Sequence, residues 1–303
     1  MSDQAEKLRK IINNLKTRQI VEQLPSEDNH SSTRNCKVIT VTSGKGGVGK
    51  TNISVNLAIN LSKMGYRVVI LDADLGLANI DILFGISPHY TLLDVINDDK
   101  SIFDILSDGP MNVKFISGGS GVEEMTRLEK WQLEAIIEKM ASLDKIADIV
   151  IVDTGAGISE NVIRFIYAAD EVILVTTPEP TAIMDAYALV KTVTKENKDV
   201  TIKLLVNRAE NIKEALNAIN KLCFATDTFL GVKLQQLGYV LYDTNVVKAV
   251  KQQEPFILSF PKSLVSRQLN DIAHKLMQAD QGTVKKSLGI KGFFRKLTNS
   301  KNI

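Results

Sequence analysis

The segment SGKGGVGKT, at residues 43–51, constrains the fold of this chain more than any other stretch. Gly44, Gly49, Lys50 and Thr51 have the spacing G-x-x-x-x-G-K-[ST], with the β-branched run KVITVT before them and a helical pattern after them. Glycines let backbone N–H groups close around phosphate oxygens, the lysine neutralises phosphate charge, and the threonine hydroxyl is a Mg²⁺ ligand. The sequence therefore predicts a strand, a phosphate-binding loop and a helix, in that order.

The same glycines also fit a second motif. Gly44, Gly46 and Gly49 read G-x-G-x-x-G, with Asp72 about where a dinucleotide-binding fold has its ribose-binding acid. Such a fold has no use for a lysine and a Mg²⁺-binding hydroxyl directly after the third glycine, so Lys50 and Thr51 argue against an NAD site. The loop residues expected to contact the nucleotide are Gly44, Lys45, Gly46, Gly47, Val48, Gly49, Lys50, Thr51 and Asn52.

Carboxylates follow two hydrophobic runs of the sequence. Asp72 and Asp74 come after VVIL, and Asp153 comes after IVIV. Because the carboxyl ends of parallel strands face the ligand crevice, we expect all three to converge on the loop. Asp153 and Asp72, with the Thr51 hydroxyl, are the expected Mg²⁺ site, and Asp74 is the expected orienting group for the attacking water. The alternative is that these aspartates only cap the helices or turns that follow.

Hydrophobic strands alternate with helical patterns between residues 36 and 280. This order predicts an α/β fold with a doubly wound, mostly parallel sheet covered by helices on both faces. The chain has 303 residues, 44% of them hydrophobic, and a net charge of +2, so it can bury a large core and has no global field for nucleic acid. Its two cysteines lie far apart without a CxxC motif, which disfavours a disulfide, zinc or cluster site.

Three motifs together carry a family resemblance. SGKGGVGKT, LDADLGLANIDILFG and IVDTGAGIS resemble the deviant Walker A ATPases of the MinD/ParA superfamily, over about residues 36–280. In that family the extra lysine, here Lys45, reaches across a dimer interface to the partner's ATP. The resemblance implies Mg²⁺-dependent ATP hydrolysis, an ATP-dependent homodimer, and catalytic roles for Lys45, Lys50 and Asp74. The alternative for Lys45 is an exposed lysine that attracts phosphate in a generic way.

The same resemblance extends to two later strand ends. It implies that Asn207 and Arg208 belong to the nucleotide-binding site, with Asn207 facing the adenine, and that Pro178 lies near the base or the dimer interface. One residue departs from the family pattern, because Gly155 stands where cell-division MinD usually has a proline. This departure weakens the hypothesis that the chain is a cell-division MinD, and it does not change the prediction of ATP hydrolysis.

The last residues, 281–303, are predicted to be a linker and a short basic amphipathic helix. Its composition is that of an interfacial membrane anchor, and it resembles the membrane-targeting helix of MinD-like proteins. The alternative is a helix that docks on its own domain or on a partner. The apolar stripe and the basic positions expected to bind an anionic membrane are Ile290, Phe293, Phe294, Leu297, Lys291, Arg295 and Lys296.

Residues 1–24 are predicted to be an amphipathic helix, and residues 25–35 a linker. The motif DQAEKLR resembles the N-terminal motif of the superfamily branch that controls flagellar number and placement, where the segment stimulates the GTPase FlhF. The alternative is a helix that packs on the protein surface. The residues that the resemblance implies in partner binding are Asp3, Gln4, Ala5, Leu8 and Arg9.

The tails and the core together favour a flagellar regulator in the cytoplasm that binds the inner face of the cell membrane reversibly. The N-terminus lacks an apolar signal region, and no stretch reaches the roughly 18 apolar residues that a spanning helix needs. Flagellar switch-complex or transcription regulator proteins are further candidate partners. The main rival is a ParA-type partition ATPase whose basic tails would bind nucleoid DNA nonspecifically.

Overall fold

The computed structural model describes residues 36–74, 79–97, 100–118, 121–125, 128–278 and 287–299. These ranges lie within one compact unit, Asn35–Ile303. The predicted N-terminal helix, with its partner-binding residues, and the linker at 25–35 lie outside the described residues. Within these ranges no helix combines the length and the apolarity that crossing a bilayer requires.

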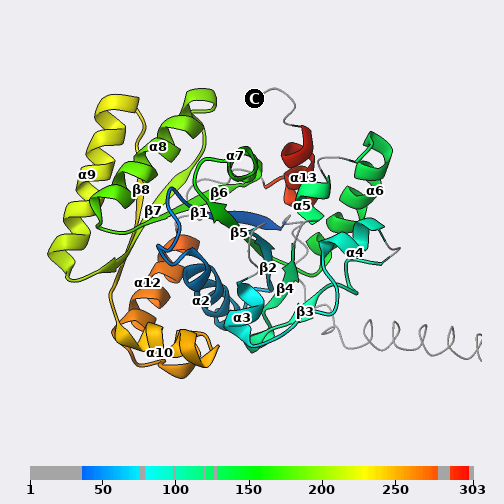
Figure 1. The fold of residues 1–303 in the computed structure, drawn as a ribbon, viewed down its shortest axis with the longest axis horizontal. Coiled ribbons are helices and arrows are strands. Elements are labelled where there is room, and N and C mark those ends of the chain that lie inside the picture. Colours follow the sequence, from blue (N-terminus) through cyan, green and yellow to red (C-terminus); the bar gives the residue numbers. More distant parts are fainter. Residues whose placement is uncertain are drawn as a thin grey trace, which may run out of the picture. The chain divides into compact units, whose positions relative to one another are not determined.

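The described part of the chain contains an eight-stranded sheet in the order β3-β4-β2-β5-β1-β6-β7-β8 (Figure 1). All neighbouring strands pair in parallel except β3 and β4. The predicted α/β fold with a mostly parallel sheet is therefore confirmed. The strands are β1 (Lys37–Ser43), β2 (Val68–Ala73), β3 (Ser107–Asp108), β4 (Lys114–Ser117), β5 (Ile149–Ala156), β6 (Glu171–Thr176), β7 (Ile202–Ala209) and β8 (Gln235–Leu241).

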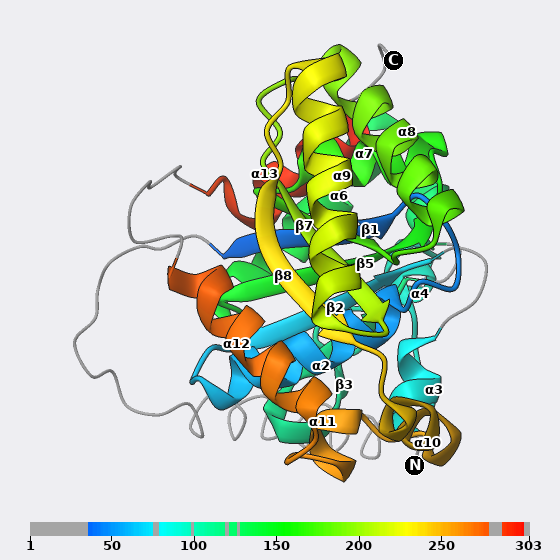
Figure 2. The same ribbon diagram turned by 90° about the vertical axis from the view of Figure 1, so that its left-hand side faces the viewer.

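Helices cover both faces of this sheet, because the central strands are apolar on both sides (Figures 1 and 2). In β1, for example, Ile39 and Val41 face one core and Val38 faces the other. The helices over the Ile39 face are α2 (Lys50–Lys63), α3 (Ile80–Phe84), α10 (Thr244–Gln252), α11 (Phe256–Ser259) and α12 (Leu264–Gln278). Those over the Val38 face are α4 (Leu92–Asn97), α5 (Gly121–Met125), α6 (Lys130–Ala141), α7 (Glu160–Ala168), α8 (Pro180–Glu196), α9 (Ile212–Leu230) and α13 (Gly289–Asn299).

The C-terminal helix α13 lies against α6 and α7 (Figure 1). Its apolar stripe joins the core on the Val38 face, with exposures of 0% for Ile290, 2% for Phe293, 1% for Phe294 and 4% for Leu297. The Phe293 ring stacks on Phe165 of α7, with the two ring centroids 6.2 Å apart. In this conformation the predicted membrane-binding stripe contacts its own domain, which is the docked alternative left open by the sequence.

Polar groups fix the start and the middle of this docked helix. The Ile290 N–H donates to Asp144 Oδ1 at 2.9 Å, and Asp144 belongs to the short 3₁₀ helix η2 (Ser142–Lys145). Gly289 has a φ of 69°, in the left-handed region that favours glycine, and a Cβ there would lie 2.9 Å from both carboxylate oxygens of Asp144. Lys291 and Arg295 pair with Glu138 and Glu134 of α6. The third predicted basic position, Lys296, is exposed.

Candidate functional site

The phosphate-binding loop lies between the end of β1 and the start of α2. Gly47 and Gly49 have φ values of 78° and 95°, in the left-handed region that favours glycine. This curvature, together with the free N–H groups of the first turn of α2, makes an anion-binding concavity. Lys50 is the first residue of α2 and is buried. Thr51 and Asn52 follow it in the first turn of the helix and are half-buried.

Gly44 is fixed by its contact with α8. A Cβ at this position would lie 2.2 Å from the carbonyl carbon of Asp185 and 2.6 Å from the backbone nitrogen of Ala186. Backbone atoms inside a helix cannot move away by rotating a side chain, so only glycine fits. By contrast, a Cβ on Gly46 would meet no atom within 4 Å. Gly44 therefore has no room for a side chain, whereas Gly46 has room for one.

The second lysine of the loop, Lys45, points toward the start of α8. Its Nζ donates to Glu179 Oε2 and to Thr181 Oγ1, each at 3.1 Å. Its backbone carbonyl accepts the Ser43 hydroxyl at 2.8 Å. Pro178 is half-buried just before this helix start. Sequence reasoning missed Glu179 and Thr181, because a residue 134 positions away carries no local signal of a contact.

The predicted acidic residues gather at the ends of adjacent strands. Asp72 of β2 and Asp153 of β5 are direct neighbours in the parallel register. Asp153 Oδ1 accepts the Ser54 hydroxyl at 2.8 Å, and its carboxylate also accepts the Thr51 hydroxyl. Asp72 accepts backbone N–H groups, among them that of Asp74 at 3.2 Å. The structure thus brings Thr51, Asp72, Asp74 and Asp153 together, and it adds Ser54, which the sequence did not suggest.

Burial perturbs the protonation of both strand-end carboxyls. Burial, followed by the charge of Asp153, raises the pKa of Asp72 to about 7. Burial also raises the pKa of Asp153, and the Lys50 ammonium is the largest opposing influence. The positive charge of Lys50 therefore favours the ionised carboxylate that a metal ligand requires.

The donor set fits Mg²⁺. Hard cations prefer oxygen ligands, and Mg²⁺ usually takes one or two protein oxygens together with phosphate oxygens and water. The Asp153 carboxylate is buried beside the loop and accepts a hydrogen bond from the Thr51 hydroxyl. In the part of the chain that the structure describes, no group of three or more His, Cys, Asp or Glu side chains could hold a metal.

Two side chains at the end of β7 donate hydrogen bonds to carbonyl groups of the loop. Asn207 Nδ2 donates to the Val48 carbonyl at 2.8 Å, and Arg208 Nη1 donates to the Gly47 carbonyl at 2.9 Å. A Cβ on Gly49 would lie 2.5 Å from Asn207 Nδ2, so Gly49 also admits this amide. In this conformation the Asn207 amide contacts the loop, and its role at the adenine stays a prediction from the resemblance.

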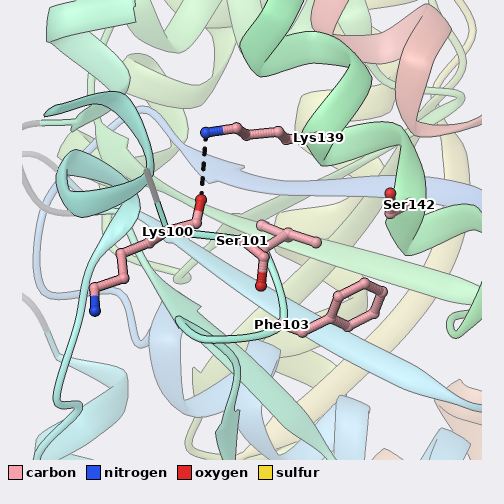
Figure 3. Close-up of a pocket in the computed structure, with 6 residues that line it drawn as sticks. Lys100, Ser101, Phe103, Lys139 and Ser142 are labelled. Carbon is pink, nitrogen blue, oxygen red and sulfur yellow. Dashed lines mark hydrogen bonds between the residues drawn. The ribbon is translucent and has the colours of Figure 1, made fainter. Parts of the chain in front are cut away.

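A separate hollow of about 190 Å³ lies where α6 meets η2 and the segment after residue 99 (Figure 3). The Lys139 ammonium, which lines it, donates to the backbone carbonyls of Lys100 and Val95 at 3.4 and 3.5 Å. None of its lining residues belongs to the loop or to the acidic strand ends. The residues that line the hollow are Lys100, Ser101, Ile102, Phe103, Lys139 and Ser142.

Comparisons with known proteins place the chain in a family. A family model described as ParA, "NUBPL iron-transfer P-loop NTPase", matches residues 34–277. The chain is 43% identical over 240 residues to "Antiactivator FleN" of Pseudomonas aeruginosa, covering 79% of this chain and 86% of FleN. It is 34% identical over 267 residues to "Flagellum site-determining protein YlxH" of Helicobacter pylori, covering 87% of this chain and 90% of YlxH.

Solved structures share the fold. The septum site-determining protein MinD of Pyrococcus horikoshii, complexed with Mg-ADP, superposes with a TM-score of 0.64 at 22% identity, covering 80% of this chain and 97% of that one. The iron-transfer description of the family model has no support in the thiols of this chain. Cys36 is buried at the start of β1, and Cys223 lies in α9.

The close approach of Gly44 to α8 generates a paired prediction. We expect Gly44→Ala to lower the free energy of unfolding by about 2 kcal/mol, because the new methyl group would overlap backbone atoms. Gly46→Ala, which enters open space, should change it by less than about 0.5 kcal/mol. Urea unfolding without nucleotide measures both variants. Equal effects would show that α8 does not hold the start of the loop.

Proposed function

Because the chain belongs to the ParA/MinD family of P-loop ATPases, we propose that it is a flagellar regulator of the FlhG type, also called YlxH or FleN. It binds ATP and Mg²⁺, dimerises with ATP, binds the membrane reversibly, and controls the number and placement of flagella. The likeness to the antiactivator FleN and to the site-determining protein YlxH supports the flagellar role. A neighbour solved with Mg-ADP supports the choice of nucleotide and metal.

The observation that carries the proposal is the separate placement of the two loop lysines. Lys50 is buried beside Asp153, where it would neutralise the charge of phosphates bound in its own loop. Lys45 instead pairs at the surface with Glu179, and the side chains of the two residues are 40% and 63% exposed. An ion pair this exposed contributes roughly 0.2–1 kcal/mol, so Lys45 exchanges it readily for a phosphate. A phosphate presented by a facing subunit would give Lys45 that alternative.

The residues of the site suit phosphoryl transfer to water. The loop N–H groups and Lys50 hold the phosphates, and Thr51 and Asp153 hold the metal. Mg²⁺, when bound, would neutralise charge on the phosphate oxygens. Asp74 lies half-buried beside Gly155. A Cβ added to Gly155 would lie 3.6 Å from Asp74 Oδ1. This placement suits a carboxylate that orients the attacking water, with Lys45 of the facing subunit stabilising the charge that develops.

The docked helix α13 defines how membrane binding works in this proposal. Its four apolar side chains are buried, and Lys291 and Arg295 pair with Glu138 and Glu134. Insertion into a membrane needs these same apolar side chains, and contact with anionic headgroups needs the same cations. Docking and membrane binding therefore exclude each other, so α13 leaves its domain before it binds lipid. Two such anchors on one dimer raise the avidity above that of one anchor.

We expect Lys45→Ala to bind ATP as a monomer and to lose turnover at least 10-fold, because it removes the cation supplied to the facing site. Asp74→Ala should accumulate an ATP-bound dimer, since phosphate and metal contacts remain when water orientation is lost. Lys50→Ala should lose tight ATP binding itself. Size-exclusion chromatography with light scattering, together with phosphate release, measures these effects. Wild-type turnover in Lys45→Ala would refute the interface role, and exposed Lys233→Ala is the matched control.

We expect Glu138→Lys to raise binding to anionic liposomes about 5-fold, because it replaces the partner of Lys291 with a like charge and weakens docking. Deleting residues 288–303 should abolish binding and keep ATP hydrolysis. Co-sedimentation with ATP and with ADP measures the effect. The control is Glu196→Lys, which makes the same charge change at the last residue of α8. Equal binding of Glu138→Lys and Glu196→Lys would contradict control by docking. Equal binding with ATP and ADP would contradict coupling to the nucleotide.

The partner role of the N-terminal segment rests on its sequence motif. A helix of about 20 residues with so small an apolar stripe is marginal in water, so it should fold on docking to FlhF. A synthetic peptide of residues 1–24 should stimulate GTP hydrolysis by FlhF, and Leu8→Asp should abolish this effect by placing a charge on the docking face. A peptide without effect on FlhF would leave only the ATPase core and its membrane anchor in the proposal.

A further inference from the structure

Two consecutive residues of β7 hold the phosphate-binding loop through its carbonyl groups. Arg208 Nη1 donates to the Gly47 carbonyl at 2.9 Å, and Asn207 Nδ2 donates to the Val48 carbonyl at 2.8 Å. The Asn207 Oδ1 atom accepts the Arg208 N–H at 2.9 Å, which joins the two side chains into one unit. Two successive peptide groups of the loop are therefore anchored through their oxygen atoms.

Anchoring a carbonyl fixes the N–H of the same peptide group. In a planar trans peptide the C=O and the N–H of the next residue point in opposite directions. The bond from Arg208 to the Gly47 carbonyl therefore sets the direction of the Val48 N–H. The bond from Asn207 to the Val48 carbonyl sets the direction of the Gly49 N–H. These N–H groups belong to the nest that binds phosphate in such loops.

The backbone of Arg208 is unusual in a way that fits this role. Its φ of 60° lies in the left-handed region, which a long side chain avoids. In the described part of the chain three other non-glycine residues share a positive φ: Met111 and Asn112 in a surface turn, and Gln253 at the end of α10. Arg208 differs from these because it sits at a strand end beside the loop. Strained backbone of this kind concentrates at functional sites.

Packing does not explain why Arg208 occupies this position. The residue is exposed, so it contributes little to the core. Its guanidinium reaches a carbonyl 161 residues away in the sequence, on a part of the loop that is itself exposed. The positive φ lies where the register of β7 shifts, between Val206 and Ala209, and there the guanidinium contacts the loop.

We propose that Arg208 is a positioning residue for nucleotide binding, which holds the Gly47–Val48 peptide so that its N–H faces the bound phosphate. This inference rests on the proposed function, because it requires a nucleotide in the loop. Preorganised N–H donors bind an anion without paying for reorientation at the moment of binding. The loop serves phosphates common to ATP and ADP, so Arg208 contributes equally to the affinity for both.

The test compares Arg208→Gly with the wild-type chain. Glycine relieves the positive φ and removes the guanidinium, so the melting temperature without nucleotide should not fall. The dissociation constants for ADP and ATP should both rise about 5- to 10-fold, as expected for the loss of one charge-assisted hydrogen bond. KM should rise by the same factor, with kcat at saturating ATP unchanged within about twofold. Arg208→Lys, which keeps a donor, should restore part of the affinity.

Gln253→Gly is the matched control, because it relieves a positive φ of 55° away from the loop and should leave ADP affinity unchanged. ADP affinity of Arg208→Gly within twofold of wild type would overturn the inference. A fall in kcat with unchanged KM would also overturn it, because Arg208 would then act in the chemical step. Wild-type protein that binds neither nucleotide, or Lys50→Ala that binds both normally, would instead refute the proposed nucleotide site.

Discussion

The contact between the loop backbone at Gly44 and the first turns of α8 is the constraint on which the site depends. Here two main chains approach so closely that no Cβ fits between them. The contact fixes where the loop leaves β1, and it brings Lys45 to Glu179 and Thr181 at the start of α8. Asn207 and Arg208 hold the loop from β7. The backbone is thus fixed from two sides, while the Lys45 side chain makes exposed contacts with Glu179 and Thr181.

The fold, the phosphate-binding loop and the strand-end aspartates could be predicted because their sequence signals are local. Glycine spacing, a lysine and a hydroxyl at the start of α2, and acids after hydrophobic strands are all local patterns. The parallel sheet then brings Asp72 and Asp153 into register as neighbours. The contacts that the sequence did not reveal join distant segments. Glu179 to Lys45, Arg208 to Gly47 and Asp144 to Ile290 each depend on packing that no periodicity encodes.

The amphipathic pattern at the C-terminus predicted α13 correctly as a helix, and it could not decide which surface covers the apolar stripe. An apolar stripe beside basic residues suits a lipid surface and an acidic protein groove equally well, because both offer an apolar layer and negative charge. On this domain α6 and α7 supply Phe165 with Glu134 and Glu138. The groove thus presents to α13 the two features that an anionic membrane would present, which is why the docked state competes with lipid.

Helix α7 connects the nucleotide site with this groove. Strand β5 carries Asp153 and ends at Ala156, and α7 begins at Glu160 with the Ser159 side chain accepting the Val162 N–H at its start. Just before it, the Gly157 N–H donates to the Ser43 carbonyl at 2.8 Å, which ties this corner to the strand that leads into the loop. The C-terminal half of α7 carries Phe165, which stacks on Phe293 of α13. A single helix of 9 residues thus runs from the corner that follows Asp153 to the surface on which α13 rests.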